Sequence, residues 1–585
     1  MSGKQYTADF ETTTDPTDCR VWAFGISQIG DPENFIYGNS IEEFMELCET
    51  TISNSTLYFH NAKFDFQFII SYLLNNGFTH IENRREKADQ TFTTLITDTG
   101  QFFSLEIYFK VKNKHVTKIK MLDSLKILNF SVEKIAKDFD LPIQKLELDY
   151  ETKRERGHIL TEHEIHYLRN DVEVMSRALK IMFDQNLKKM TIASDAISEF
   201  KDLFPDFKSY FPILPFDLDR MARASYKGGF TYLSPLYKEQ QTGAGIVFDK
   251  NSMYPAKMKQ EILPVGEPMI FEGKYKFDFA MPLYIQFLTC TFNLKPGKIP
   301  SIQIKNQPFF KANEYLENSG PDFVELALTS VDLELFLENY DVDIVSWDGG
   351  LKFMGMSGVF NDYIDKWTTN KIKAKAEHNG SLYTISKLML NSLYGKFGLN
   401  PRCAKKLPFL GDDGVVKYKR TDIEERDPIY VPVASYITSY ARADIIRSSQ
   451  QIRDFSLNKY GNDAYIYSDT DSIHCLLSRE DLPELSKFMD IDDYQLGAWK
   501  LESEFSRGKY LRQKCYIEED LSGEITATIA GLPKRLGKLI NFENFRVGFS
   551  TTELDPNDVQ KLGNKLTYKY VPGGVVLIDT DFEIK

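Results

Sequence analysis

Two aspartates in the stretch Ala464–Leu477 (AYIYSDTDSIHCLL) have the residue type and spacing to hold a divalent metal ion. The apolar, β-prone runs Tyr465–Tyr467 and Ile473–Leu477 flank a polar pentad, which predicts a hairpin with acidic residues at its turn. Asp469 and Asp471 stand two apart, so in extended backbone their carboxylates leave on the same side. Such carboxylates repel unless a cation lies between them, and hard oxygen ligands favour Mg²⁺ or Mn²⁺. An ordinary Asp-rich turn is the commoner outcome, and the pentad alone leaves both open.

The composition indicates a large folded protein with an uneven distribution of charge. The 585 residues are 42% hydrophobic and 26% charged, which is ordinary for a chain of several domains. The net charge of −13 argues against a nucleic-acid partner when it is taken over the whole chain. Residues 371–420, however, hold eleven Lys and Arg against three Asp and Glu, and Arg507–Lys514 adds four more basic residues. Local basic tracks on an acidic body suit an enzyme that must hold a phosphate backbone and release it.

The cysteines and the apolar runs exclude several other classes of protein. Six cysteines are scattered without a CxxC pair, so we expect neither a disulfide scaffold nor a zinc site. We find no apolar run long enough to span a bilayer, and the beginning MSGKQYTADF has no signal-peptide core. We therefore expect a cytoplasmic protein with no membrane partner.

A second set of acids lies near the N-terminus. Asp9 and Glu11 alternate with apolar side chains, which predicts a half-buried strand with both acids on its open face. Asp65 follows a short apolar strand and begins a helical run, a usual place for catalytic groups in α/β folds. Tyr167 and Asp171 fall at i and i+4 on one face of a helical pattern. Each signal alone is weak, because an isolated DxE is most often simply solvated.

Taken in order, these four acids and the tyrosine resemble the proofreading 3′–5′ exonucleases of the DEDDy type. The resemblance implies that the four acids hold two divalent ions, which activate a water and stabilise the leaving oxygen of a phosphodiester. It also implies that Tyr167 orients that water and that Lys145, in IQKLELDY, is a further catalytic lysine. An aromatic ring in such a site can stack on a base. The positions that match single-strand ligands of these exonucleases are Thr12, His60, Asn61, Phe64, Ser124 and Leu125.

Two further motifs lie between residues 190 and 260. The helical pattern stops in the Pro- and Phe-rich stretch Leu203–Pro215, and we place a domain junction near residue 190. The paired glycines of Tyr226–Gly229 (YKGG) would let backbone amides approach a phosphate closely, although a plain turn has the same composition. Asp249 ends an apolar strand in GIVFDKNSMYPAKM, and Tyr254 with the following proline begins a new element.

The central basic region predicts two helices folded back on each other. Helical patterns over Phe360–Lys375 and Ser381–Phe397 are separated by an Asn-Gly pair, which indicates an αα-hairpin. In the second helix the apolar residues form one stripe, and Lys387, Asn391 and Tyr394 lie together on the opposite face. A solvated polar face has the same pattern.

These motifs, in this order, resemble those of family B DNA polymerases. The sequence DxxSxYP, which begins at Asp249, resembles motif A, and KLMLNSLYG resembles motif B. The DTDS turn resembles motif C, and Lys514-Cys515-Tyr516 resembles the KxY motif. The resemblance implies that Asp249 and Asp471 bind two Mg²⁺ ions, for which Mn²⁺ can substitute, while Asp469 shapes their field. One ion would activate the primer 3′-hydroxyl and the other would accompany pyrophosphate.

The same resemblance assigns roles to the residues around the carboxylates. A tyrosine ring under the incoming sugar would exclude a 2′-hydroxyl, and two lysines would neutralise the triphosphate. The implied nucleotide-binding residues are Tyr254, Lys371, Lys387, Asn391 and Tyr394. The implied DNA-binding residues are Tyr226, Gly228, Gly229, Ser252, Lys514 and Tyr516.

Stretches such as IPSIQIK, KLMLNSLYGKF and YLRQK look close to the DNA polymerases of small Bacillus podophages with linear, protein-capped genomes. Residues 260–358 and the basic loop Leu399–Arg420 resemble the two terminal-protein-region insertions of protein-primed polymerases. The resemblance implies that the first docks a terminal protein, whose hydroxyl primes synthesis. The second would close a ring round DNA and give processivity with strand displacement. Species-specific decoration is the alternative, and two aspartates within the loop weaken a DNA-clasping surface.

The expected fold class is therefore α/β and multidomain, with an RNase H-like exonuclease and a right-hand polymerase of palm, fingers and thumb with two insertions. We expect the exonuclease at 1–190, the palm at 191–260 and 426–530, the insertions at 261–358 and 398–425, the fingers at 359–397 and the thumb at 531–585.

The expected function is replicative DNA synthesis by a monomer in the cytoplasm of a bacterial host. Its partners would be primer–template DNA, deoxynucleotides, a terminal protein and single-stranded DNA at the exonuclease site. One rival is a polymerase that extends only nucleic-acid primers. Another is a scaffold that binds DNA without catalysis, which predicts broken carboxylate sets, whereas every expected carboxylate is present. A reverse transcriptase is disfavoured because DTDS accompanies a proofreading module.

Overall fold

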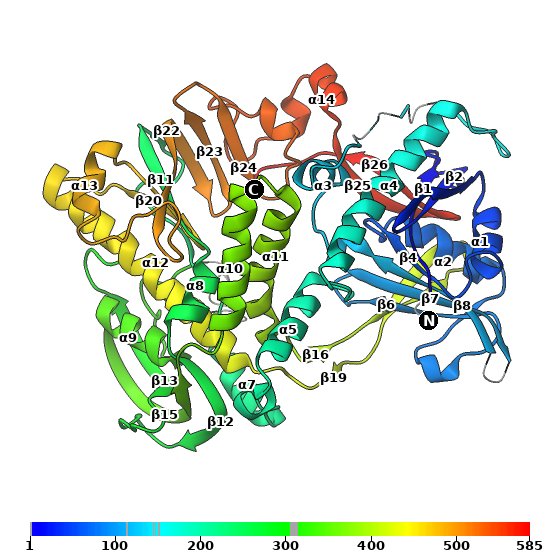
Figure 1. Ribbon diagram of the computed structural model, residues 1–585. Coiled ribbons are helices and arrows are strands. Elements are labelled where there is room, and N and C mark those ends of the chain that lie inside the picture. The colour runs from blue at the N-terminus through cyan, green and yellow to red at the C-terminus, as the bar shows by residue number, and fades with distance from the viewer. Residues whose placement is uncertain (1–2, 113–114, 144–145, 147, 150–151, 305–313) are drawn as a thin grey trace.

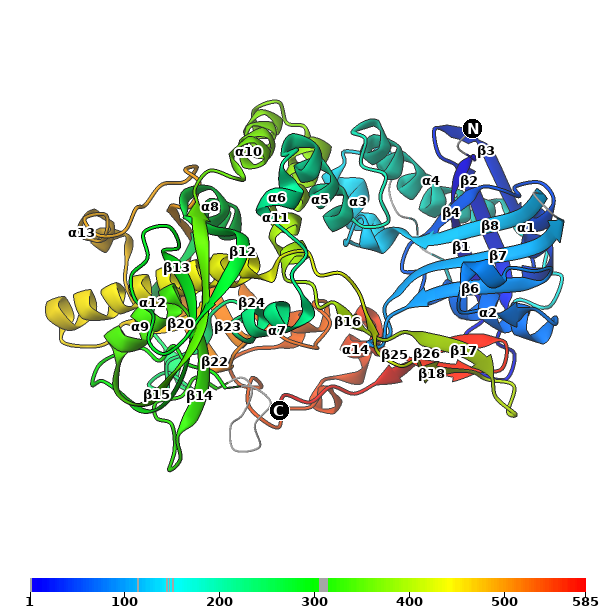
Figure 2. The same ribbon diagram turned by 90° about the horizontal axis from the view of Figure 1, so that it is seen from below.

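The computed structural model describes residues 3–112, 115–143, 146, 148–149, 152–304 and 314–585. Figure 1 shows an elongated molecule in which the N-terminal strands lie at one end and the central segments at the other. The last strands of the chain return to the N-terminal end (Figure 2). None of the described helices has a stretch both apolar and long enough to cross a bilayer.

A mixed sheet of eight strands forms the N-terminal part. Its strands are β1 (Gln5–Thr12), β2 (Val21–Gln28), β3 (Asp31–Gly38), β4 (Thr56–Phe59), β5 (Thr79–His80), β6 (Thr91–Ile96), β7 (Phe102–Lys112) and β8 (His115–Asp123). They follow the order β3-β2-β1-β4-β8-β7-β6-β5, and β4 is parallel to both β1 and β8. The helices of this part are α1 (Ile41–Glu49), α2 (Asp65–Asn75), α3 (Val132–Asp138) and α4 (Glu162–Asp184).

The two faces of β1 are buried against different helices. Tyr6, Ala8 and Phe10 belong to the core that also contains residues of α1 and α2. On the other face, the Thr7 hydroxyl donates to the Val172 carbonyl of α4 at 2.7 Å. Because alternate residues of a strand share a face, the acids of β1 lie together on the face toward α4, as the alternation predicts. The expectation that this face is open is wrong, because α4 covers it and Glu11 is buried.

The central part is built on an antiparallel sheet. Its strands are β9 (Thr231–Leu233), β10 (Gln241–Thr242), β11 (Gly245–Lys250), β20 (Tyr465–Asp469), β21 (Ser472–Cys475), β22 (Trp499–Arg512), β23 (Cys515–Asp520) and β24 (Ile525–Ile529). They follow the order β24-β23-β22-β11-β21-β20-β9, and β10 pairs with β22. The helices packed around it include α8 (Met253–Gln260), α12 (Val431–Tyr460) and the short α13 (Leu482–Leu485).

The predicted helical hairpin stands beside this sheet (Figure 1). It consists of α10 (Asn361–Ala376) and α11 (Gly380–Phe397). The Asn379 side chain accepts a hydrogen bond from the first turn of α11, which fixes where that helix begins. Of the predicted apolar stripe, Ile385, Met389 and Leu393 are fully buried, and Leu382 in the first turn is partly buried.

Aromatic packing joins the hairpin to the stretch that precedes the central sheet. That stretch contains α5 (Ile192–Leu203), α6 (Phe207–Tyr210) and α7 (Phe216–Ala224), and α5 ends where the helical pattern was expected to stop. Phe200 stacks on Phe360 with 4.6 Å between ring centroids, and Phe211 meets Phe397 at 5.2 Å. The phenylalanines therefore form a core rather than an exposed linker.

Two further segments interrupt the central part. The first is a sheet in the order β12-β15-β13-β14, composed of β12 (Leu263–Phe271), β13 (Leu283–Leu294), β14 (Val324–Thr329) and β15 (Tyr340–Met356), with α9 (Ser330–Asn339) before the last strand. The second, which follows α11, contains β16 (Arg402–Cys403), β17 (Lys406–Leu410), β18 (Val416–Arg420) and β19 (Glu424–Glu425).

The C-terminal hairpin completes the N-terminal core. It follows α14 (Pro556–Leu562) and pairs β25 (Lys565–Val571) with β26 (Gly574–Thr580). Val571, Val575 and Val576 of this hairpin and Val416 of β18 are buried in the core of the N-terminal part. Two segments distant in sequence thus meet at α2 (Figure 2).

Candidate active sites

The central sheet brings Asp249 to the acidic hairpin, although more than two hundred residues separate them. Asp249 of β11 lies opposite Ser472 of β21, and the backbone N–H of Lys250 donates to the Asp471 carbonyl at 2.8 Å. The hairpin itself is formed by β20 and β21, as predicted. The prediction that folding joins these two motifs is confirmed.

The hairpin tip differs from the extended geometry that we expected. Thr470 has a φ of 63°, a left-handed conformation that is unusual for a β-branched residue. The Asp471 N–H turns back onto the Asp469 carbonyl at 2.7 Å. Asp471 is therefore a turn residue, and the expectation of extended backbone from Asp469 to Asp471 is wrong. The turn, and not the pleat, sets their directions.

Left-handed backbone recurs at other candidate site residues. Asn61, Ser252 and Lys514 have φ values of 67°, 50° and 56°. A left-handed backbone costs energy for residues other than glycine. Such residues are often found at functional sites, where the surrounding structure stabilises the strained conformation.

Crowded carboxylates raise each other's pKa at the central site. Burial raises the pKa of Asp249 to about 7, and the negative charges of Asp471 and Glu502 add to the rise. Burial and the charge of Asp469 raise the pKa of Asp471 as well. Glu502, on β22, was missed because LESE carries no motif that we recognised. A divalent cation would relieve this repulsion through oxygen ligands, so the residues fit the expected Mg²⁺.

Asp469 has a lysine partner in this structure. Lys514 Nζ lies 2.8 Å from each carboxylate oxygen of Asp469. The hydroxyls of Tyr467 and Thr231 donate to the same carboxylate at 3.2 Å. Contact between Lys514 and a primer, as the KxY resemblance implies, would require that this ion pair be shared or exchanged.

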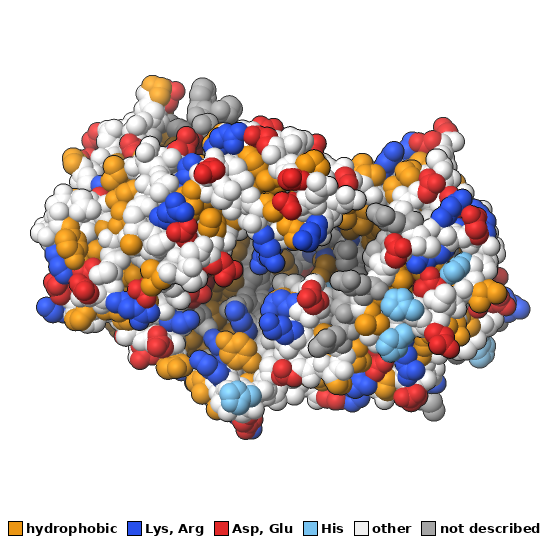
Figure 3. Space-filling view, turned by 90° about the horizontal axis from the view of Figure 1, so that it is seen from above, with side chains coloured by type: hydrophobic (Ala, Val, Ile, Leu, Met, Phe, Trp, Pro, Cys, Tyr) orange, Lys and Arg blue, Asp and Glu red, His pale blue; other side chains and the backbone are white. Residues whose placement is uncertain are grey.

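Four of the five predicted nucleotide-binding residues lie close enough to the central carboxylates to interact with their charge, namely Tyr254, Lys371, Lys387 and Tyr394. The rings of Tyr254 and Tyr394 are 4.1 Å apart between centroids, so motifs A and B meet in one aromatic contact. Lys371 of α10 donates to the Ser252 hydroxyl at 3.3 Å. Lys387 and Asn391 are exposed on α11. Figure 3 shows Lys and Arg side chains gathered around a hollow in the middle of one face of the molecule.

The two glycines of the YKGG motif differ in their surroundings. A Cβ on Gly229 would lie 2.9 Å from Thr470 Cγ2 and 3.0 Å from the Tyr254 hydroxyl, whereas a Cβ on Gly228 would meet nothing within 4 Å. Gly229 is thus required for close packing against the DTDS tip. This physical reason is additional to the predicted approach to a phosphate.

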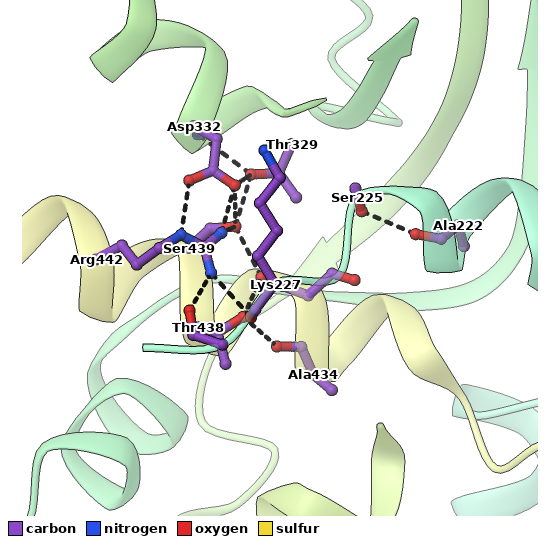
Figure 4. Close-up of polar contacts among 11 residues, drawn as sticks. Ala222, Ser225, Lys227, Thr329, Asp332, Ala434, Thr438, Ser439 and Arg442 are labelled. Carbon is purple, nitrogen blue, oxygen red and sulfur yellow. Dashed lines mark hydrogen bonds and ion pairs between the residues drawn. The ribbon is translucent and has the colours of Figure 1, made fainter. Parts of the chain in front are cut away.

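A buried arginine holds the backbone of the same motif (Figure 4). Arg442 of α12 donates from Nη1 to the carbonyls of Lys227 and Gly228 at 2.9 and 2.8 Å. Its Nη2 pairs with Asp332 of α9 at 2.5 Å. Burial would raise the pKa of Asp332, but the charges of Arg442 and Lys227 outweigh it and hold that pKa below its usual value. No sequence signal links these distant residues.

The N-terminal acids form a second cluster, in a cavity of about 530 Å³. Asp9 and Glu11 of β1 and Asp171 of α4 each offer an oxygen within 4.8 Å of the others. Asp65 at the start of α2 and Tyr167 of α4 line the same cavity. Three carboxylates at this spacing fit a hard divalent ion, so the donor set suits the expected metal. Lys145 lies outside the described residues.

Asp65 illustrates the electrostatic cost of this cluster. Burial raises its pKa well above the usual value, and the negative charges of Asp9 and Asp123 raise it further. A cation bound in the cavity would counter the negative charge of Asp9, lower the pKa of Asp65 and so favour the ionised form of the Asp65 carboxylate.

An unpredicted carboxylate organises the candidate strand-binding residues. Asp123 Oδ1 accepts from the backbone N–H groups of Asn61, Ala62 and Leu125 at 3.1, 3.3 and 3.0 Å. Asn61 thereby presents an exposed side chain from a left-handed residue. Asp123 was not selected from the sequence because a single Asp at a strand end is common.

Ser124 requires a correction to its predicted role. Its side chain is fully buried, and its hydroxyl donates to the Phe59 carbonyl at 2.9 Å and lies 3.0 Å from His60 Nδ1. We therefore revise its role from a contact with DNA to support of His60, which lines the cavity together with Thr12. Burial lowers the pKa of His60, which favours a neutral ring.

The C-terminal hairpin closes the same cavity. Leu566 and Tyr568 of β25 and Val576 and Leu577 of β26 line it. The Tyr568 ring lies 6.2 Å from that of Phe64. Sequence reasoning missed these residues, because nothing in a local pattern places the end of the chain beside its beginning.

Comparisons with known proteins identify the family. A sequence profile described as DNA polymerase type B, organellar and viral, matches residues 46–485. The chain is 43% identical to the DNA polymerase of Bacillus phage M2 and 42% identical to that of Bacillus phage phi29, each over 100% of both chains. The chain belongs to the organellar and viral type B DNA polymerases. It is also 33% identical to the DNA polymerase of Streptococcus phage Cp-1, over 99% of this chain and 98% of that one.

Solved structures of phi29 DNA polymerase share the fold over the whole chain. Phi29 DNA polymerase complexed with primer–template DNA and incoming nucleotide superposes with a TM-score of 0.91 at 40% identity, covering 100% of both chains. The same polymerase complexed with single-stranded DNA gives 0.89. The predicted fold class and the resemblance to Bacillus phage polymerases are confirmed. The protein is an enzyme, a DNA-directed DNA polymerase.

Proposed function

We propose that the central site catalyses template-directed nucleotidyl transfer and that Asp249 and Asp471 hold its two metal ions. The observation that carries this proposal is the pairing of β11 with β21, which brings Asp249 to the DTDS turn, where the charge of Asp471 helps to raise the pKa of Asp249. Tyr254, Tyr394, Lys387, Asn391 and Lys371 would bind the deoxynucleotide. The metal, Mg²⁺ or Mn²⁺, supplies activation of the attacking hydroxyl and charge stabilisation of the leaving group when it is bound.

The chain's own residues would bind and orient the substrates. Tyr254, packed on Tyr394, presents a rigid ring under the sugar and excludes a 2′-hydroxyl. Arg442 and Gly229 hold the YKGG backbone against the DTDS tip, where a primer strand would pass. Tyr226, Gly228, Ser252, Lys514 and Tyr516 complete the proposed DNA-binding set.

The N-terminal cluster would be a separate 3′–5′ exonuclease that proofreads. Its support is the set of three carboxylates within 4.8 Å of one another, with Asp65 in the same cavity. Tyr167 would orient the attacking water, and Lys145 would assist. Thr12, His60, Asn61, Phe64 and Leu125 would hold a frayed single strand, with Ser124 as support. Solved complexes of phi29 polymerase with primer–template and with single-stranded DNA favour both substrate classes for this chain.

Whole-length similarity to Bacillus phage polymerases also supports initiation on a terminal protein. We assign residues 261–358 and 398–425 as the two insertions, beside an exonuclease at 1–190, a palm at 191–260 and 426–530, fingers at 359–397 and a thumb at 531–585. The first insertion would dock the terminal protein. The second, with β17 and β18 packed on α2, would enclose DNA and support processive strand displacement. The polymerase would act as a monomer in the cytoplasm of a bacterial host.

The direct test combines two assays on the purified full chain with Mg²⁺. We expect extension of a labelled primer when all four deoxynucleotides are present and its shortening when they are absent. Co-expression with a candidate terminal protein, followed by addition of labelled dATP, should attach one nucleotide covalently to that protein. Extension of DNA primers without any labelled protein would contradict protein priming while leaving the polymerase proposal standing.

A further inference from the structure

A second cavity lies beside the central carboxylates, on the side of the helical hairpin. It has a volume of about 160 Å³, and three lysines line it: Lys371 and Lys375 of α10 and Lys500 of β22. Its other polar lining consists of Asn251, Ser252, Thr368, Tyr383, Asp493 and Tyr494. The cavity thus joins the fingers to a strand of the central sheet.

The register of the sheet fixes where Lys500 lies. Lys500 on β22 pairs opposite Asp249 on β11. Directly opposed residues of an antiparallel pair project to the same face of the sheet, so Lys500 stands beside the carboxylate proposed to hold metal. Its positive charge opposes the rise in the pKa of Asp249, which agrees with this proximity.

The three lysines place more positive charge in the cavity than its walls neutralise. Within the described part of the chain, no carboxylate forms an ion pair with Lys371, Lys375 or Lys500, and Asp493 is the one acidic residue of the lining. Burial lowers the pKa of Lys371, and the neighbouring charges of Lys387, Lys375 and Lys500 add to that effect. Such unbalanced positive charge favours an anion with several oxygens.

We propose that Lys500 is a phosphate ligand on the palm side of the nucleotide site, binding the β- and γ-phosphates of the deoxynucleotide and the pyrophosphate that leaves. It would oppose Lys371 and Lys375 across the cavity. Unlike the two lysines of α10, it stands on the same sheet as Asp249 and would keep its place if the helical hairpin moved. This inference rests on the proposed polymerase function of the central site.

Charge balance in the reaction explains why a lysine is useful there. The primer 3′-oxygen forms a bond to the α-phosphorus and gives up its proton to solvent, while the bond from that phosphorus to the bridging oxygen breaks. The electron pair of the broken bond stays on pyrophosphate, whose negative charge increases. An ammonium group stabilises that charge as it develops and binds pyrophosphate in the reverse reaction.

The test compares Lys500→Met and Lys500→Arg with Lys373→Met in the full chain. Lys373 is the matched control, because it is an exposed lysine of α10 outside the cavity that pairs with Glu377 at 3.9 Å. Three quantities are measured at saturating Mg²⁺: the KM for deoxynucleotide, the pyrophosphate concentration that drives half-maximal primer shortening in an Asp9→Ala background, and the Kd for primer–template. Degradation of single strands by Lys500→Met with Asp9 intact verifies the fold.

We expect Lys500→Met to raise the KM and the half-maximal pyrophosphate concentration together, each by about tenfold, because a charge-assisted contact to phosphate is lost. Lys500→Arg should restore both the KM and the half-maximal pyrophosphate concentration to near the wild-type values. Lys373→Met should change neither quantity. The Kd for primer–template should stay within about twofold of wild type. An unchanged response to pyrophosphate, or an increase in the Kd for primer–template instead, would overturn the proposal. Absence of extension in the wild type would count against the polymerase proposal itself.

Discussion

The N-terminal and central carboxylate sites use the same chemical groups but are assembled in different ways. Asp9 and Glu11 share one strand and meet Asp171 of a helix packed on it, so that cluster forms within one module. Asp249 and Asp471 come from distant segments and meet through the register of two strands. The central site therefore depends on strand register, whereas the N-terminal site depends on the packing of α4 and the C-terminal hairpin around β1.

The two sites also differ in their positive charge. Asp469 is paired with Lys514, and Lys387 and Lys500 act on Asp249. Among the described residues that line the N-terminal cavity there is no Lys or Arg, and aromatic rings such as Phe64 and Tyr568 line it instead. A deoxynucleotide brings three phosphates and needs counter-charge, whereas a strand end offers bases to stack and a single phosphodiester.

Removal of the N-terminal acids should separate the sites most clearly. We expect Asp9→Ala combined with Glu11→Ala to slow degradation of a labelled single strand by about three orders of magnitude, since several kcal/mol of metal-derived stabilisation is lost. Primer extension should stay within about twofold of wild type. Asp15→Ala, which removes an exposed acid nearby, is the control. Parallel loss of extension would show that the sites are not independent.

The stability and the polymerase activity of the central site should depend on Arg442, which joins α12 to α9 and to the YKGG motif. Replacement by Met removes the arginine from the buried carboxylate of Asp332, which keeps the charge of Lys227 and the Ser439 hydroxyl nearby. We expect the free energy of unfolding in urea to fall by about 3 kcal/mol. Arg447→Met removes a half-buried arginine of the same helix, whose ion pairs are with surface carboxylates, and should cost below about 1 kcal/mol. At temperatures where both variants stay folded, Arg442→Met should lose extension more than degradation. An equal loss of both activities would contradict the link to the YKGG motif.

The aromatic lining of the N-terminal cavity should matter for strand binding. We expect Tyr568→Ala to raise the Kd for a single strand by about tenfold, because one stacking platform is removed. Tyr570→Ala, on the same strand but outside the cavity lining, should have little effect. Fluorescence anisotropy in Ca²⁺, without degradation, measures both. Equal weakening by the two variants would indicate a general effect on the hairpin.

Substitution of the two glycines of the YKGG motif should give the smallest change in activity, but the two variants should differ clearly from each other. Gly229→Ala puts a methyl group 2.9 Å from Thr470, so we expect extension to fall about fivefold through strain at the DTDS tip. Gly228→Ala meets open space and should remain close to wild type. If Gly228→Ala were the more harmful change, close approach of DNA at Gly228, and not packing at Gly229, would govern this motif.

Much of both sites could be predicted because short-range patterns carry them. Alternation on β1 placed Asp9 and Glu11 on one face, and helical spacing placed Lys387, Asn391 and Tyr394 together. Motif order then joined Asp249 to Asp471. These features depend on the period of a strand or helix and on residue types, which a single sequence displays.

The remainder depends on contacts that no local pattern encodes. Tyr568 reaches the N-terminal cavity only because β25 and β26 complete a core begun by β1 and α2. Asp332 and Arg442 meet through the packing of α9 on α12. Thr470 adopts a left-handed turn where extended backbone was expected, because contacts with Phe230 and Gly229 hold it.

The most direct measurement follows one labelled primer–template with Asp249→Ala. In the presence of deoxynucleotides and Mg²⁺ the variant should extend no primer, since the carboxylate beside the hairpin tip is gone. In their absence it should shorten the same primer at a rate within about twofold of wild type. Retained extension, or loss of shortening together with extension, would contradict two separate carboxylate catalysts in one chain.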